Sequence, residues 1–137
     1  MKEFVNDQFN RVYFDESNAI HYHITKADTA IMLEHDFKEM LLKWKESVFE
    51  VNPKKILVNN LEFDFPISPE LQMWTVANAS KPVMELPSVE KFCFVMPTEL
   101  VPKLSVSQLT QESNKMGGRI QLRFFGSYEN AHNWLLT

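Results

Sequence analysis

Cysteine and glycine are scarce in this sequence, and each shortage excludes a class of site. With one cysteine among 137 residues, the chain can form neither an intramolecular disulfide nor a multi-cysteine zinc site. Three glycines are too few for most glycine-rich phosphate-binding loops. Positive charge is not in excess either, and a net charge of −4 gives no electrostatic reason to expect nucleic acid as a partner.

Long apolar runs are also missing. No stretch approaches the length of about 20 apolar residues that spans a bilayer, and the first residues carry no apolar core of a secretion signal. These absences predict a cytoplasmic protein with no integral membrane segment.

The residues that are plentiful are those that build a core. Hydrophobic residues make up 45% of the chain, with 11 phenylalanines and 7 methionines. We find no internal repeat, low-complexity tract or linker, so we predict one domain over residues 1–137. Nothing in the composition indicates a cofactor.

The first strong pattern is a hairpin. Residues 9–15 and 19–24 flank a cluster of turn-forming residues and predict two antiparallel strands. In the second strand Ile20, Tyr22 and Ile24 alternate with His21 and His23. We therefore expect an apolar face on one side of this strand and a solvated polar face on the other.

A long amphipathic helix follows. Apolar residues recur at steps of three and four, the spacing of one helical face. We expect the helix to begin near Asp28 or Thr29 and to end before Asn52-Pro53. The apolar residues of that face are Phe37, Met40, Leu41, Trp44, Val48 and Val51.

The rest of the chain alternates between strands and helices. Strands are predicted at 55–58, 92–96 and 119–125, and the last of these alternates so that one of its faces is solvated. Helices are predicted at 68–80, from 105 or 107 to 116, and from 127 to 135. The order β-β-α-β-α-β-α-β-α predicts an α/β domain, with a mixed sheet and about four helices mainly on one face.

Few residues point to chemistry. His21 and His23 share a strand face at a spacing that some metal sites use, but a third ligand is not fixed, and a solvated face explains them more simply. Glu62 and Asp64 could form an acid–base pair, yet their aromatic neighbours favour a loop whose acids stay in water. Cys93 is expected to be a buried apolar residue. We predict no catalytic residue, no metal site and no enzymatic activity.

Two polar features near helices and strands also have simple interpretations. Lys115, Arg119 and Arg123 form a weak basic group that a solvated strand face explains. Ser68, followed by Pro69 and Glu70, is typical of a helix start, with serine as the N-cap. A phosphate on Ser68 would be tolerated at the positive end of the helix dipole, but a cap alone is the favoured interpretation.

With these elements in place, the chain resembles the STAS domain family (sulfate transporter and anti-sigma factor antagonist), in its bacterial SpoIIAA-like branch. The resemblance covers the order of elements along the whole chain and three segments at residue level. These segments are KILVN at 55–59, ISPELQMW at 67–74 and RFFGSYENAHNWL at 123–135.

The resemblance implies a non-enzymatic regulatory module that binds another protein. In STAS anti-sigma factor antagonists a serine at the start of the helix after the central strand is phosphorylated, and Ser68 corresponds to it. The sequence departs from the family pattern at Asn59-Asn60, where an acid is expected, and no glycine follows Ser68. The resemblance implies an unidentified protein partner, or a homodimer, at a surface that contains Ser68, Gln72, Met73, Val76, Asn59 and Asn60, with Gln72, Met73 and Val76 expected to be accessible.

The same branch is grouped with lipid-binding domains of the CRAL-TRIO type, which gives an alternative function. A small apolar ligand would then be bound in a pocket near the carboxyl ends of the strands. The candidate lining residues are Phe63, Phe65, Trp74, Met84 and Met96, although a filled core around a long loop is the simpler interpretation.

Overall fold

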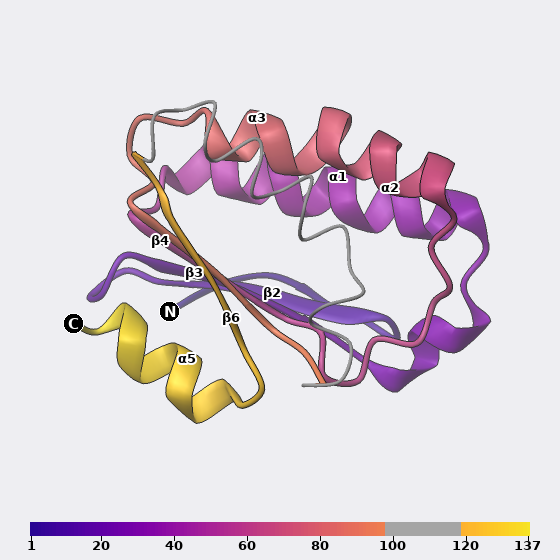
Figure 1. The fold of residues 1–137 in the computed structure, drawn as a ribbon, viewed down its shortest axis with the longest axis horizontal. Helices are drawn as coiled ribbons and strands as arrows, with labels where there is room; N and C mark the ends of the chain where they lie inside the picture. Colours follow the sequence, from indigo (N-terminus) through magenta and orange to yellow (C-terminus); the bar gives the residue numbers. More distant parts are fainter. Residues whose placement is uncertain (98–118) are drawn as a thin grey trace.

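One mixed sheet organises the protein in this computed structural model, which describes residues 1–97 and 119–137 (Figure 1). Within these residues the sheet has six strands, arranged side by side in chain order. The first three strands are antiparallel, and the third to the sixth are parallel. The strands are β1 (Lys2–Asn6), β2 (Asn10–Asp15), β3 (Ile20–Thr25), β4 (Lys55–Asn59), β5 (Lys91–Val95) and β6 (Gln121–Phe125).

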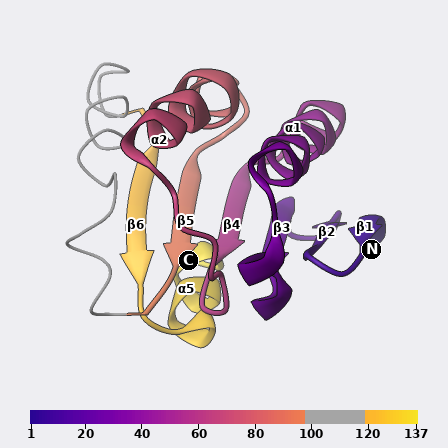
Figure 2. The same ribbon diagram turned by 90° about the vertical axis from the view of Figure 1, so that its right-hand side faces the viewer.

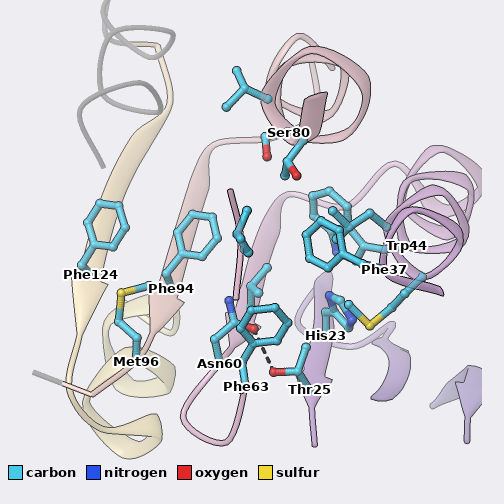
Figure 3. A pocket seen from close by; sticks show the side chains of 16 residues that line it. His23, Thr25, Phe37, Trp44, Asn60, Phe63, Ser80, Phe94, Met96 and Phe124 are labelled. Atoms are coloured by element: carbon cyan, nitrogen blue, oxygen red, sulfur yellow. Dashed lines mark hydrogen bonds between the residues drawn. The ribbon is translucent and has the colours of Figure 1, made fainter. Parts of the chain in front are cut away.

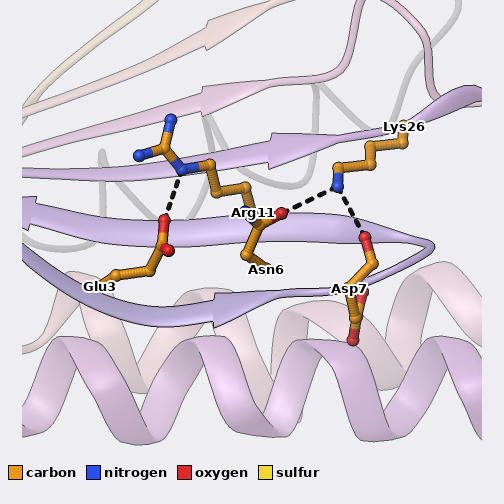
Figure 4. Close-up of polar contacts among 5 residues, drawn as sticks. All are labelled: Glu3, Asn6, Asp7, Arg11 and Lys26. Carbon is orange, nitrogen blue, oxygen red and sulfur yellow. Dashed lines mark hydrogen bonds and ion pairs between the residues drawn. The ribbon is translucent and has the colours of Figure 1, made fainter.

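The predicted α/β class and mixed sheet are confirmed, and β1 is an addition to the prediction. Only Phe4 and Val5 of this edge strand are half-buried, so its sequence carries no clear alternation. Side chains hold β1 against its neighbours. Glu3 Oε2 accepts from Arg11 Nε at 2.6 Å, and Lys26 Nζ donates to Asn6 Oδ1 at 3.0 Å (Figure 4).

The described helices lie on both faces of the sheet (Figure 2). Helix α1 (Glu34–Val51) and the run α2 (Pro69–Thr75), η2 (Val76–Ser80) and α3 (Lys81–Met84) cover one face, which we call the pocket face. Helix α5 (Tyr128–Leu135) covers the other, which we call the α5 face. The helix predicted between 105 or 107 and 116 lies outside the described residues.

The long helix begins later than its pattern suggested. Residues Ala27–Ile31 form a separate 3-10 turn, η1, and α1 starts at Glu34, where the Leu33 N–H donates to Asp36 Oδ2 at 2.9 Å. Thr29 does not start the helix. Its hydroxyl connects two loops instead, because it donates to the Lys26 carbonyl and accepts from the Asp64 N–H. The end of α1 before Pro53 is as predicted.

The helical run after β4 continues to Met84, beyond the predicted end near Ser80, and contains one π-helical segment. In η2 the Lys81 N–H donates to the Val76 carbonyl, five residues back. The proline that follows, Pro82, has no N–H to donate and would clash with the carbonyl four residues earlier in a regular α-helix. The wider π-turn accommodates this proline inside a continuous helix.

Alternation along the central strands separates two cores. Ile56 and Val58 of β4 point to the pocket face, where they join Trp44 in one apolar cluster. Leu57, between them, joins Tyr22 in a second cluster beneath α5. The buried central strands therefore divide their side chains between two hydrophobic layers.

The polar face of β3 is not solvated, contrary to the expectation from its alternation. His21 and His23 are both buried, because α1 covers this side of the hairpin. Arg119 likewise is not simply a solvated side chain, since its guanidinium donates to the Met84, Pro87 and Val89 carbonyls. None of the helices formed by residues 1–97 and 119–137 is long and apolar enough to cross a membrane.

Candidate functional site

A mainly apolar pocket lies on the pocket face, and the register of the strands forms its floor. His23, Val58, Phe94 and Phe124 are consecutive partners across β3, β4, β5 and β6, so they form one row of side chains. All four line the pocket (Figure 3). The next row consists of Thr25, Asn60 and Met96, two residues further along their strands, and it also lines the pocket.

Helices form the opposite wall. Phe37, Met40, Leu41 and Trp44 of α1 line the pocket, at the spacing that places side chains on one face of a helix. The helical run after β4 contributes Thr75, Val76 and Ser80, two of them from the π-turn. Phe63 and Ile67, from the loop between β4 and α2, complete the lining. The pocket therefore lies at the carboxyl ends of the parallel strands.

The pocket is small, mainly apolar and uncharged. Its volume is about 110 Å³, and it is partly open to solvent. Among the described residues that line it, none is an aspartate, glutamate, lysine or arginine. Binding an ion there would require burial of a charge without a partner, which is strongly unfavourable.

A few polar groups are set into this apolar lining. The Thr25 hydroxyl donates to Asn60 Oδ1 at 2.9 Å, which holds the ends of β3 and β4 together (Figure 3). Ser80 is a buried residue that lines the pocket, and its hydroxyl makes no hydrogen bond to another residue in the described part of the chain. The Trp44 indole N–H is also buried and has no acceptor among the described residues.

Of the two buried histidines, His23 lines the pocket and His21 does not. His23 Nε2 is 3.1 Å from Asn10 Oδ1, which can only accept, so Nε2 carries the proton. Ser47 donates its proton to the Trp44 carbonyl, so His21 Nε2 must donate to Ser47 Oγ, at 2.7 Å. Burial lowers the pKa of His23 to about 4, and burial with the neighbouring His23 lowers the pKa of His21 to about 3. Both rings are neutral at pH 7.

The pocket residues proposed from the sequence are found in three places. Phe63 and Met96 line the pocket. Phe65 stacks on Phe37 at 5.1 Å, in the cluster next to it, and Trp74 lies under Lys38 on the helical layer. Met84 is fully buried in the core beneath α3 and does not line the pocket, because the helical run places it about two turns beyond Val76.

The residues proposed for an interaction surface are only partly accessible. Ser68 is exposed at the N-cap of α2, where its Oγ accepts from the Leu71 N–H at 3.1 Å. Met73 is 61% exposed and Gln72 is half-buried. The expectation that Val76 is accessible is wrong, since it is 9% exposed and faces the pocket.

Asn59 and Asn60 act within the loop that follows β4. Asn59 Oδ1 accepts from the Leu61 N–H at 3.1 Å, and Asn60 Oδ1 accepts from Thr25. Neither amide oxygen is left free by these contacts, and both fix the start of the loop that leads to Phe63. These residues therefore position the edge of the pocket.

Sequence reasoning missed most of the pocket. Trp44, Phe94 and Phe124 were predicted only as parts of a helix or strands, His23 was considered only as a metal ligand or a solvated side chain, and Thr25 lies outside the predicted strand 19–24. Their positions in the strands are the signal that could have found them. Residues at equivalent positions near the carboxyl ends of neighbouring parallel strands lie together at one edge of the sheet.

The other chemical candidates do not form a site. Residues 1–97 and 119–137 contain no group of three or more His, Cys, Asp and Glu side chains that could hold a metal ion. Glu62 and Asp64 are exposed. Burial raises the pKa of the Cys93 thiol to about 12, so this cysteine is not a reactive thiolate.

Comparison of the chain with models of protein families, with curated proteins and with solved structures finds no match. The resemblance to STAS domains therefore remains a prediction from the sequence.

Proposed function

We propose that the protein binds a small, mainly apolar molecule in the pocket between the sheet and helices α1 and α2, as a carrier or sensor of that molecule. The observation that carries this proposal is the mainly apolar lining at the carboxyl ends of the parallel strands, which has several aromatic rings and, among the described residues, no charged side chain. In open α/β sheets this edge is where ligands are generally bound.

The local backbone supports the same proposal. The π-turn of η2 places Val76 and Ser80 on the pocket wall, and π-turns inside α-helices occur often at functional sites. The Ser80 hydroxyl is buried there without a hydrogen bond to another described residue. This hydroxyl is therefore a hydrogen-bonding group on the pocket wall that no described residue uses.

The proposal is tested first by native mass spectrometry of gently purified protein, compared with a denatured sample. A bound molecule gives an extra mass that disappears on denaturation. Benzene then serves as a probe of the emptied pocket, and we expect it to raise the melting temperature, because a ligand stabilises the state that binds it.

A matched pair of variants assigns that effect to the pocket. Ser80→Leu fills the pocket with apolar atoms and breaks no hydrogen bond between described residues, whereas Ala77→Leu adds the same atoms on the exposed side of the helix. The proposal requires benzene to stabilise the wild type and Ala77→Leu but not Ser80→Leu. Equal stabilisation of all three proteins, or of none, would contradict it.

A second candidate function is a regulatory module that binds another protein, as the resemblance to STAS domains implies. The observation that favours it is the exposure of Met73, five residues after the exposed Ser68 that caps the same helix. A phosphate or carboxylate at Ser68 would change the charge of this surface while the helix dipole tolerates it.

The test of this candidate uses the two serine caps of the protein. Ser127 caps α5 with the same geometry as Ser68, its Oγ accepting from the Asn130 N–H at 3.1 Å. A partner retained by wild type and by Ser127→Asp, but lost by Ser68→Asp, would support a regulated surface at α2. Retention by all three proteins would exclude regulation through Ser68.

A further inference from the structure

The side chain of Ser80 brings a hydrogen-bonding group to the wall of the pocket. The residue is 6% exposed, and it lines the pocket. Figure 3 shows its hydroxyl pointing down from the helical run, into the space bordered by the rings of Phe94 and Phe37. A molecule that fills this space therefore lies against the hydroxyl.

Two other hydroxyls of the helices on this face are used within the fold. Ser47 Oγ donates to the Trp44 carbonyl at 2.7 Å, and Thr75 Oγ1 donates to the Leu71 carbonyl at 2.8 Å. Both bond to a carbonyl about one turn earlier in their own helix, as serine and threonine commonly do. Ser80 makes no such bond to a described residue, and it ends the π-turn, where the spacing of the helical hydrogen bonds changes.

The polar groups across the pocket are bonded elsewhere. The Thr25 hydroxyl donates to Asn60 Oδ1, and His23 Nε2 is bonded to Asn10. A polar group in a protein interior normally has a hydrogen-bond partner, because an unmade bond there costs free energy. A ligand can supply the partner that the described residues do not give to Ser80.

Charge and size restrict that ligand. The lining has no charged side chain among the described residues, so an oxygen that accepts from Ser80 is bound most favourably when it is neutral. The pocket volume of about 110 Å³ is similar to that of an engineered apolar cavity of about 150 Å³ that binds benzene. The part of the ligand inside the pocket is therefore about the size of one ring.

We propose that the pocket binds a small apolar molecule through one neutral oxygen, which accepts a hydrogen bond from the Ser80 hydroxyl. This inference rests on the proposed ligand-binding function and adds the chemical class of the ligand, which is a ketone, ester or ether and not a plain hydrocarbon. Ser80 orients the ligand, and the phenylalanine rings of the lining pack against its apolar part.

Three probes built on one kind of ring test the proposal on the full-length protein, freed of any bound molecule. Cyclohexanone carries an acceptor oxygen, methylenecyclohexane has a CH₂ group in the same place, and cyclohexanecarboxylate is an anion. Dissociation constants are measured for the wild type, Ser80→Ala and Thr75→Val. Thr75→Val is the matched control, because it removes a pocket hydroxyl that is already bonded to its own helix.

We expect Ser80→Ala to weaken cyclohexanone binding about fivefold, as the loss of one hydrogen bond does, and to change methylenecyclohexane binding less than about twofold. The cost of removing cyclohexanone from water is the same for both proteins, so it cancels in this comparison. Thr75→Val should change the affinities for these two probes by the same factor. Cyclohexanecarboxylate should bind the wild type about tenfold more weakly than cyclohexanone does.

A second readout follows the hydrogen bond itself. Hydrogen bonding lowers the stretching frequency of a carbonyl group, and a carbon-13 label separates the ketone band from the bands of the protein. Bound cyclohexanone should absorb at a lower frequency in the wild type and in Thr75→Val than in Ser80→Ala.

The outcomes separate this inference from the proposed function. If neither cyclohexanone nor methylenecyclohexane binds, the ligand-binding function itself is wrong. If both bind, but Ser80→Ala affects both alike and leaves the carbonyl band in place, the pocket binds apolar molecules and the role of Ser80 is overturned. Tighter binding of cyclohexanecarboxylate than of cyclohexanone would overturn the assignment of a neutral oxygen.

Discussion

The two faces of the sheet are built from alternate residues of the same strands, yet they are packed in different ways. On the α5 face Leu57, Cys93, Ala131 and Leu135 are all fully buried, and the buried polar groups of their cluster are the Cys93 thiol and the hydroxyls of Tyr13 and Tyr22. On the pocket face the neighbouring row of the sheet carries a histidine, and its aromatic side chains border a pocket. A shift of one residue along each strand separates a closed, mainly apolar core from a row of side chains that borders a pocket.

This difference indicates how the protein divides stability from function. The α5 face is covered by a short helix whose Ala131 and Leu135 fit directly onto the strands. The pocket face is covered by longer helices, one of which contains a π-turn, and two buried polar groups there have no hydrogen-bond partner among the described residues: His21 Nδ1 and the Trp44 indole N–H. Incomplete polar satisfaction at one face is the cost of a binding site there.

The largest difference between the faces is expected in acid. His21 and His23 belong to the pocket face, and burial lowers the pKa values to about 3 and about 4, from 6.5 in an unfolded chain. Below pH 6.5 the two histidines bind protons in the unfolded state but not in the folded state. The free energy of unfolding is therefore highest above pH 6.5 and falls as the pH decreases toward 4. Between pH 7.5 and pH 5 the two histidines together lower the free energy of unfolding by about 4 kcal/mol.

Urea unfolding across this pH range measures the effect. His21→Gln, which leaves a hydrogen-bonding group near Ser47, should remove about half of the loss, and His35→Gln, at an exposed position on α1, is the matched control. A wild-type free energy of unfolding that is the same at pH 5 and pH 7.5 would show that the buried histidines become protonated without destabilising the fold.

The next largest difference is expected from removing a leucine side chain on each face. Leu57 is fully buried beneath α5, so Leu57→Ala leaves a new cavity and should cost about 3 kcal/mol. Leu41 is partly buried and borders the existing pocket, so Leu41→Ala enlarges that pocket and should cost about 1 kcal/mol. Urea unfolding of the two variants measures these losses of unfolding free energy, provided that the slope of the free energy against urea concentration is unchanged. Equal losses would mean that the pocket face is as closely packed as the α5 face.

Much of the frame that supports both faces could be predicted from local patterns. The hairpin of β2 and β3, the parallel strands, the end of α1 at Asn52 and the N-cap at Ser68 all follow from short-range signals. Each of these depends on the preferences of a few neighbouring residues, which a single sequence contains.

The burial of particular faces could not be predicted in the same way. The alternation of β3 correctly places His21 and His23 on one side, but only the position of α1 decides that this side is covered. Similarly, β1 is a strand because β2 pairs with it, and its own residues carry little pattern. Packing between distant segments decides both cases.

The pocket is the part least visible in the sequence. Phe63 and Met96 could be proposed because aromatic residues and methionine lie in or beside a connection near the strand ends. The row of His23, Val58, Phe94 and Phe124 depends on the register of four strands, and the place of Met84 depends on how far the helical run continues beyond its π-turn. Register and helix continuation are long-range properties.

A smaller and more symmetrical effect is expected at the serine caps, one on each face. Ser68 and Ser127 each accept from the N–H three residues later, at 3.1 Å in both cases. Replacement of either by alanine should cost about 1 kcal/mol, measured by chemical unfolding. Because aspartate is also a good cap, Ser68→Asp and Ser127→Asp should both keep the wild-type stability. A loss confined to Ser68→Asp would mean that the surroundings of α2 reject negative charge.

The smallest effect concerns the cations that lie over one tryptophan on each face. Lys38 Nζ is 5.2 Å from the centre of the Trp74 ring on the pocket face, and Arg123 lies 5.4 Å from Trp134 on the α5 face. Exposed cation–π pairs contribute about 0.5 kcal/mol each. Double-mutant cycles with Lys38→Gln and Trp74→Leu, and with Arg123→Gln and Trp134→Leu, should give coupling energies of about this size.

The coupling energy on the α5 face should be the smaller of the two, because Lys91 also lies over Trp134, at 5.1 Å, and keeps a cation on the ring when Arg123 is removed. A larger coupling on the α5 face would show that the two cations there reinforce each other in holding the tryptophan in place.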